Sequence, residues 1–294
     1  MDLLVVGHTN IDRFLEVDRL PAVDRTVPVR SAREVLGGTA ANIARSAAGW
    51  GVAAGVLSLV GEDFPPRFVE ELRRSRVDVR GLLRVPGARS PYCVIVEDGA
   101  GGQFTLIDQA AMHDGVRGPV PNELLRGCRW VHLTTGPTAY QLRVGREARR
   151  RGVHVAVDPA QEVHYRWDRR GIETLLAGAE VLFGNRAEID RVLALLRLRR
   201  REELLARVPL VVETRAGRGA IGWTRSRVVR VPAAKHRRLR QVTGAGDAFR
   251  GGFYSGWFSG QPIEDCLRAG TRSAARWIEA GGAPSGPPGP GARP

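Results

Sequence analysis

Val242-Thr243-Gly244-Ala245-Gly246-Asp247-Ala248-Phe249 places a glycine turn directly before a predicted helix. Gly244 and Gly246 allow a tight turn whose backbone N–H groups converge. The apolar spacing of Phe249, Phe253 and Trp257 predicts a helix that begins at this turn. The unpaired N–H groups and positive dipole of a helix N-terminus favour a phosphate and the charge that develops as a phosphoryl group moves. Asp247 adds a carboxylate that can act as a base, so the stretch indicates phosphoryl transfer.

A plainer interpretation makes the glycines an ordinary loop and leaves Asp247 to complement the helix dipole. A P-loop is excluded, because no G-x-x-x-x-G-K-[ST] pattern occurs and the chain has a single lysine, Lys235. The rest of the chain must therefore decide between a reactive site and a loop.

Two stretches near the N-terminus place polar residues at expected ligand positions. The apolar run Leu3-Leu4-Val5-Val6 predicts a buried strand, and His8-Thr9-Asn10-Ile11-Asp12 follows its carboxyl end. Ligands of open α/β sheets bind outside such ends. Further on, Gly37-Gly38 precede the small residues of a predicted helix that carries Asn42, which could equally be a structural polar residue in a tight helix contact.

Two more stretches follow predicted strands in the second half of the chain. Asn185-Arg186-Ala187-Glu188 comes after Val181 to Phe183, and as an isolated pattern it could be a helix cap. Thr214-Arg215-Ala216-Gly217-Arg218-Gly219 comes after the strand that contains Val211 and Val212.

In their order along the chain, the five stretches resemble the motifs of the ribokinase-like (PfkB) carbohydrate and nucleoside kinases, and they span nearly the whole chain. The wording around His8 to Asp12 is most similar to archaeal nucleoside kinases of that family. The resemblance implies that Asp247 deprotonates the acceptor hydroxyl and that the amides of Gly244, Ala245 and Gly246 hold the transferred phosphate.

The same resemblance implies roles for the other motif residues. It assigns the acceptor to Asn10, Asp12, Gly37, Gly38 and Asn42. It assigns the nucleotide to Asn185, Thr214, Gly217, Gly219 and Thr243. Mg²⁺ would be held indirectly through waters by Glu188, because Mg²⁺ keeps most of its waters and uses few carboxylates.

The sequence departs from the family's pattern at two places. Arg215 and Ala216 stand where many members have lysine or Thr-Lys-Gly, and Gln241 stands where an aspartate commonly precedes the glycine motif. The first departure affects a phosphate contact, and the second affects a hydrogen bond that braces the loop.

The hydrophobic pattern predicts an α/β fold with a doubly wound, mostly parallel sheet. Apolar runs alternate with helical segments, which is typical of a sheet covered on both faces. The alternating stretches Val27 to Val35, Tyr92 to Val96 and Phe104 to Ile107 predict an antiparallel excursion, which the resemblance makes a lid. We expect a kinase domain over 1–280, with lid strands at about 13–35 and 90–109, and a flexible Gly/Pro-rich tail over 281–294.

Composition narrows the partners. The net charge of +14 raises nucleic-acid binding as a possibility, but the arginine runs lie on different predicted elements, with few aromatic residues among them. The three cysteines are widely spaced without a C-x-x-C pair, so neither disulfides nor a zinc site is indicated. Neither a signal peptide nor a membrane segment is expected, so the predicted location is the cytoplasm. The lid is a candidate surface for a homodimer.

These observations predict an ATP-dependent phosphotransferase that acts on the 5′-hydroxyl of a nucleoside, with Mg²⁺ as the cofactor. The nearest alternative is a kinase of free sugars, resembling ribokinase or fructokinase. A more distant alternative is a non-catalytic protein that binds phosphate or nucleic acid. The sequence leaves the acceptor and the choice of ATP or ADP open.

Overall fold

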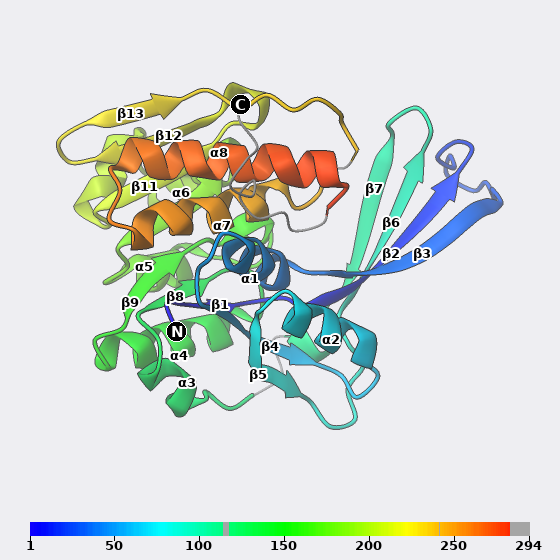
Figure 1. Ribbon diagram of the computed structural model, residues 1–294, viewed down its shortest axis with the longest axis horizontal. Helices are drawn as coiled ribbons and strands as arrows, with labels where there is room; N and C mark the ends of the chain where they lie inside the picture. Colours follow the sequence, from blue (N-terminus) through cyan, green and yellow to red (C-terminus); the bar gives the residue numbers. More distant parts are fainter. Residues whose placement is uncertain (114–117, 241, 283–294) are drawn as a thin grey trace.

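A large, mostly parallel sheet forms the centre of the molecule (Figure 1). The structure is a computed structural model that describes residues 1–113, 118–240 and 242–282. Within these residues the sheet has nine strands in the order β13-β12-β11-β10-β9-β8-β1-β4-β5. The strands are β1 (Leu3–Val6), β4 (Ala54–Val60), β5 (Asp78–Arg84), β8 (Trp130–Leu133), β9 (His154–Val157), β10 (Val181–Asn185), β11 (Leu210–Thr214), β12 (Ala220–Thr224) and β13 (Val228–Val231). The pairings of β11 with β12 and of β12 with β13 are antiparallel and the others in this sheet are parallel, so the predicted doubly wound, mostly parallel fold is confirmed.

Helices cover both faces of this sheet. One face carries α1 (Thr39–Gly49), α2 (Pro66–Arg74), α7 (Ala245–Phe258) and α8 (Ile263–Ala280). The other carries α3 (Asn122–Arg126), α4 (Thr138–Arg150), α5 (Arg169–Leu176) and α6 (Arg186–Leu196). Short 3₁₀ turns lie at η1 (Ala110–Met112), η2 (Ala160–His164), η3 (Arg201–Ala206) and η4 (Ala216–Arg218).

The buried run of β1 explains why both faces are covered. Leu3 and Val5 pack into the core under α1 and α7. Leu4 and Val6 pack into the core under α4 and α5. Because successive side chains of a strand point to opposite faces, a continuous apolar run needs a helical layer on each side.

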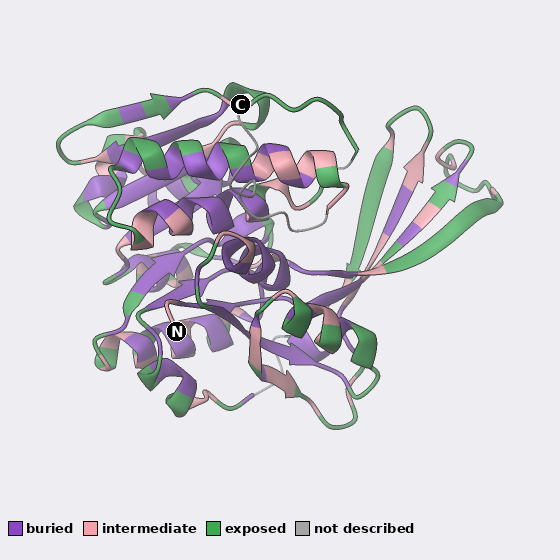
Figure 2. Cartoon of the chain, in the orientation of Figure 1, coloured by how far each residue is buried: buried purple, intermediate pink, exposed green. Residues whose placement is uncertain are grey.

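A second, four-stranded sheet projects from the body as the lid (Figure 1). Its strands are β2 (Asn10–Val17), β3 (Val29–Gly37), β6 (Tyr92–Asp98) and β7 (Gln103–Asp108), in the order β3-β2-β6-β7. The outer strands are largely exposed (Figure 2), and Leu106 of β7 is 61% exposed.

The expectation of an antiparallel lid is wrong at the centre of this sheet. β2 pairs antiparallel with β3, and β6 with β7, but β2 and β6 run parallel to each other. Two separate hairpins build the lid, and hydrophobic alternation within each hairpin carries no information on how the two pair.

Helix α8 ends where the glycine-rich segment begins. Gly281 takes the left-handed conformation, with φ of 73°, that commonly closes a helix. Of the expected tail, residues 283–294 lie outside the described residues, as does Gln241. None of the helices in the described ranges has both the length and the apolar character needed to cross a bilayer.

Candidate active site

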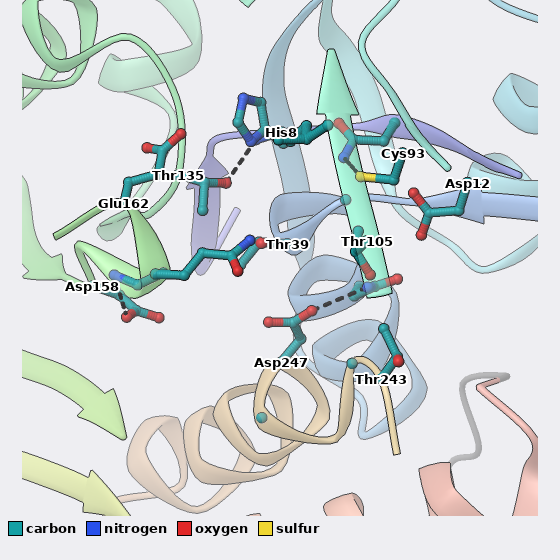
Figure 3. A pocket seen from close by; sticks show the side chains of 18 of the residues that line it. His8, Asp12, Thr39, Cys93, Thr105, Thr135, Asp158, Glu162, Thr243 and Asp247 are labelled. Atoms are coloured by element: carbon teal, nitrogen blue, oxygen red, sulfur yellow. Dashed lines mark hydrogen bonds between the residues drawn. The ribbon is translucent and has the colours of Figure 1, made fainter. Parts of the chain in front are cut away.

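A cavity of about 310 Å³ lies where the carboxyl ends of the central strands meet the lid and α7 (Figure 3). It gathers residues from all five sequence motifs, although these lie far apart in the sequence. The residues of those motifs that line it are His8, Asn10, Asp12, Gly38, Thr39, Asn42, Asn185, Glu188, Thr214, Thr243, Gly244, Gly246 and Asp247.

The glycine turn is held open at the start of α7. Gly244 has φ of 83°, and a Cβ atom there would lie 2.9 Å from the indole of Trp277, so this position needs glycine. Trp277 Nε1 also donates a hydrogen bond to the carbonyl of Thr243 at 2.8 Å. No described side chain caps α7. The Ala245 N–H donates to the carbonyl of Val242 at 3.0 Å, which corrects its expected place among the anion-binding amides, so the N–H groups of Gly246 and Asp247 are the first-turn donors suited to an anion.

Asp247 is the buried carboxylate at this turn. Asn42 Nδ2 of α1 donates a hydrogen bond to Asp247 Oδ2 at 3.0 Å, across 205 residues of sequence. Burial raises the pKa of Asp247 to about 7, opposed by the guanidinium of Arg250 and the Asn42 contact. The nearby carboxylates of Asp158 and Glu188 raise it further. A carboxyl with a pKa close to neutral is suited to general-base catalysis.

Asp12 lies on the lid side of the cavity, on β2. Burial raises its pKa to about 6, which the thiol of Cys93 partly offsets. Asp12 Oδ1 and Asn10 Oδ1 are buried without a hydrogen-bond partner in the structure. Buried polar atoms are costly when unpaired, so these two acceptors fit a ligand that donates hydroxyl hydrogen bonds.

The two glycines before α1 have different roles. Gly38, with φ of 95°, lines the cavity and precedes the first helical residue. Gly37 does not line it: a Cβ atom there would overlap the carboxyl group of Asp12. Its assignment to the acceptor therefore becomes indirect, since Gly37 makes room for the residue that faces the acceptor.

Asn185 and Glu188 form the capping box that was the simpler interpretation of their spacing. Asn185 Oδ1 accepts from the Glu188 N–H at 2.9 Å, and Glu188 Oε2 accepts from the Asn185 N–H at 2.6 Å. Both residues nevertheless line the cavity. The cap fixes where the carboxylate lies, so the structural and the ligand-binding interpretations are compatible.

The donor set suits Mg²⁺ held through phosphates and waters, not a protein cage. In the described ranges, no cluster of three or more His, Cys, Asp or Glu residues could hold a metal ion. The Glu188 carboxylate, near a helix N-terminus suited to phosphate, matches the preference of Mg²⁺ for one or two carboxylates plus substrate phosphates.

A second cavity, of about 740 Å³, opens on the other side of the glycine turn. It shares Asn185, Thr214 and Gly246 with the first cavity, so the two meet at the turn. Its lining includes Gly217, Gly219 and Ala245, together with apolar side chains of α7 and α8 such as Phe249 and Ile278. An apolar surface beside a helix N-terminus has the chemistry that a nucleotide's base and phosphates need.

Arg215 does not replace the lysine that many relatives of the motif carry. Its Nε contacts Glu213 Oε1, and Glu213 is fully buried at the end of β11. The guanidinium is thereby directed to a structural ion pair, which accounts for this departure from the motif.

Sequence reasoning gave no role to several residues that line the first cavity. These are His8, which stands in the stretch that ends at Asp12, and Cys93, Thr135, Asp158 and Arg250. For Arg250 a signal existed, because a charged residue stands within the apolar face of a predicted helix. Asp158 had a weaker one, since it directly follows the buried strand β9.

The comparisons with known proteins follow the geometry. The family model described as pfkB family carbohydrate kinase matches residues 1–288. The chain belongs to the pfkB family of carbohydrate kinases. This kinase therefore carries the fold and the motifs that the sequence indicated.

Individual relatives are similar over most of their length. The kinase is 29% identical over 279 residues to a nucleoside kinase of Methanothermobacter thermautotrophicus, covering 95% of this chain and 89% of that one. It is 30% identical over 292 residues to an ATP-dependent ribose-1-phosphate kinase of Halopiger xanaduensis, covering 97% and 94%. The crystal structure of Methanocaldococcus jannaschii nucleoside kinase, an archaeal member of the ribokinase family, superposes with a TM-score of 0.88 at 26% identity, covering 97% and 95%.

Proposed function

We propose that this kinase transfers the γ-phosphoryl group of ATP to the 5′-hydroxyl of a nucleoside, with Asp247 as the base. The first cavity would hold the acceptor and the second the nucleotide, and they are called the acceptor cavity and the nucleotide cavity below. The contact between Asn42 and Asp247 carries the proposal, because it fixes the buried carboxylate next to the turn where the two cavities meet. An acceptor held by Asp12 and Asn10 would present its reacting hydroxyl to Asp247, beside the glycine turn.

Each step of the transfer has a group suited to it. Asp247 accepts the hydroxyl proton as the oxygen attacks the γ-phosphorus, the bond from that phosphorus to the β-phosphate oxygen breaks, and ADP leaves. The N–H groups of Gly244 and Gly246 stabilise the charge on the transferred phosphoryl group, whereas that of Ala245 donates to the carbonyl of Val242. Mg²⁺ would neutralise charge on the donor phosphates when bound, near Glu188 and Asn185. The lid residues Asp12 and Asn10 orient the acceptor, and orientation is a large part of catalysis in phosphoryl transfer.

The cavity favours an acceptor larger than a free pentose. Beyond Asp12 it continues along Ile95 and Ile107 of the lid to Gln161 and Tyr165 around η2. These side chains combine apolar surface with an amide that both donates and accepts, which suits a flat heterocyclic base. Similarity to nucleoside kinases supports the same acceptor class.

The experiment that tests this function is a turnover panel of adenosine, guanosine, inosine, cytidine, uridine, ribose and fructose, each with ATP and with ADP. A nucleoside turned over best with ATP is the expected result. A free sugar as the best acceptor would contradict the nucleoside assignment, and ADP as the better donor would contradict the assignment of ATP.

Two further proposals concern the setting of this activity. The exposed apolar side chains of β7, Phe104 and Leu106, support a homodimer through the lid, which the molecular mass in solution tests. The free state of Cys93, Cys128 and Cys266 fits a reducing compartment such as the cytoplasm, which imaging of the tagged protein in its native cells tests.

Asp12→Ala should raise the acceptor KM by about tenfold or more, since hydrogen bonds to a charged group contribute about 1.5–3 kcal/mol. The ATP KM should stay within about threefold, because Asp12 lines the acceptor cavity and not the nucleotide cavity. Initial rates over both substrates measure this. Asp18→Ala, in the exposed connection after β2, is the matched control and should change neither KM. A collapse of ATP affinity in Asp12→Ala would show that the two cavities are assigned the wrong way round.

Activity should fall as the medium becomes acidic. The pKa of Asp247 is about 7, so its carboxyl is ionised above this pH and protonated, hence unable to accept a proton, below it. We expect kcat/KM for the acceptor to level off above about pH 7, to decrease about tenfold per pH unit between about pH 7 and 6, and to decrease more steeply below about pH 6, where Asp12 is protonated as well. A pH profile from about 5.5 to 9, recorded with the wild type and with Asp247→Asn, measures this. A flat wild-type profile across the acidic half would contradict the pKa-limited base.

A further inference from the structure

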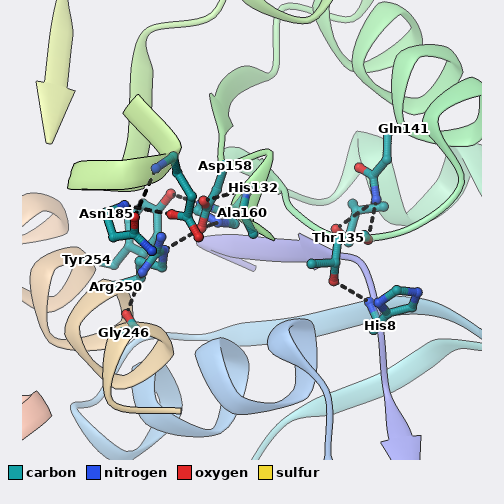
Figure 4. A network of polar contacts seen from close by, with 12 residues as sticks. His8, His132, Thr135, Gln141, Asp158, Ala160, Asn185, Gly246, Arg250 and Tyr254 are labelled. Atoms are coloured by element: carbon teal, nitrogen blue, oxygen red, sulfur yellow. Dashed lines mark hydrogen bonds and ion pairs between the residues drawn. The ribbon is translucent and has the colours of Figure 1, made fainter. Parts of the chain in front are cut away.

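A chain of buried polar contacts lies beneath the first two turns of α7 (Figure 4). Arg250 Nε donates to Asp158 Oδ2, just past the end of β9. The same oxygen lies 3.7 Å from His132 Nε2 of β8, and His132 Nδ1 lies 2.7 Å from the hydroxyl oxygen of Tyr254. All four side chains are buried. Because Arg250 and Tyr254 both belong to α7, the chain of contacts begins and ends on the same helix and passes through two strands of the sheet.

Arg250 has a second contact, which points at the reactive turn. Its Nη1 donates to the carbonyl of Gly246 at 2.8 Å, one turn earlier in α7. Gly246 belongs to the anion-binding turn and immediately precedes Asp247. The planar guanidinium thus makes two directed contacts at once, one to the turn and one to the sheet, which a point charge cannot do in a fixed geometry.

The pair that Arg250 forms with Asp158 is charged. Burial disfavours the ionised form of Asp158, but the guanidinium of Arg250, with His132, outweighs it and holds the pKa of Asp158 below its usual range. A buried ion pair is weak evidence for stability, because the cost of removing two charges from water offsets most of the attraction. Its place directly below Asp247 therefore calls for a reason other than stability.

We propose that Arg250 is a positioning residue for phosphoryl transfer: by joining Gly246 to Asp158, it sets α7 against the sheet so that the glycine-turn amides and Asp247 face one point. The inference rests on the proposed role of Asp247 as the base. The acceptor contacts of Asp12 and Asn10 come from the lid, on a different element from Arg250.

Arg250→Gln is the test, with ATP and the nucleoside of highest kcat/KM from the panel as substrates. We expect kcat to fall about 10²-fold, the cost of a misplacement of about 1 Å in a reacting group. The acceptor KM should stay within about threefold, because Asp12 and Asn10 still bind the acceptor in the variant. Arg250→Lys should recover part of kcat but stay at least about tenfold below wild type, since lysine keeps the charge and loses the two-pronged contact.

Arg149→Gln is the matched control, because Arg149 of α4 donates to the carbonyl of Leu175 at 2.7 Å, outside both cavities. It should lower the melting temperature and leave kcat unchanged. The proposal is overturned if folded Arg250→Gln keeps kcat within about threefold of wild type, or if the acceptor KM rises as much as kcat falls. If Arg250→Gln does not fold, the kcat and the acceptor KM of Arg250→Lys decide the proposal by the same limits. Failure of the base assignment would instead appear as Asp247→Asn retaining its turnover, whereas failure of this inference alone leaves Asp247→Asn inactive.

Discussion

Asp247→Asn should lower kcat by about 10²- to 10⁴-fold, the usual cost of losing a general base. The amide has nearly the shape of the carboxyl group, so its carbonyl oxygen can still accept the hydrogen bond that Asn42 Nδ2 donates at 3.0 Å. What it cannot do is take the proton of the acceptor hydroxyl. Steady-state kinetics should therefore show a loss in kcat with the acceptor KM and the ATP KM nearly unchanged.

The same variant distinguishes Asp247 as a catalytic base from Asp247 as a charge that only complements the helix dipole. If Asp247 only complemented the N-terminus of α7, removing its charge would cost stability of about 0.3–1 kcal/mol and leave turnover intact. Melting curves and circular dichroism establish that the variant is folded. Near wild-type kcat in a folded Asp247→Asn protein would restore the dipole role and remove the base from the proposed function.

Local features were the part of the site that the sequence could predict. The turn at Gly244 and the helix after it depend on residues within a few positions of one another, and so does the capping box of Asn185 and Glu188. The covering of both sheet faces likewise follows from the continuous apolar run of β1. In each case the deciding contacts are local, or the pattern repeats along one element.

The long-range contacts could not be predicted this way. Asn42 reaches Asp247 across 205 residues, and Arg250 reaches Asp158 across 92. The sequence assigned Asn42 to the acceptor, and the structure adds that Asn42 donates a hydrogen bond to Asp247. The role of Gly37 also depends on how the strands pair, because Gly37 lies against the Asp12 side chain of the neighbouring strand. Such roles depend on register and strand order, which residue patterns specify only weakly.

The chemistry of the lid suggests how substrate size could control the reaction. Asp12, Cys93 and Ile107 all lie on lid strands and line the acceptor cavity. The nucleobase of a nucleoside, by filling the space between Ile107 and η2, would hold the lid against the body. A free pentose would leave that space to water. Binding energy from this non-reacting part of the substrate can then be used to orient the 5′-hydroxyl toward Asp247.

At least one purine or pyrimidine nucleoside is therefore expected to exceed ribose in kcat/KM by about 10²-fold or more, equivalent to about 3 kcal/mol of transition-state binding. The measurement compares the nucleosides with ribose and fructose at one fixed ATP concentration. Ile107→Ala should lower the ratio of kcat/KM for the nucleoside to kcat/KM for ribose, because it removes apolar contact to the nucleobase. The kcat/KM of this variant for ribose should change little. Glu97→Ala, on the neighbouring lid strand and outside the cavity, is the control and should keep the full ratio. If ribose or fructose were the best acceptor, the nucleoside assignment would fall. The proposed roles of Asp247 and the glycine-turn amides would stand, because Asp247 takes the proton of whichever hydroxyl reacts and the amides contact the transferred phosphoryl group.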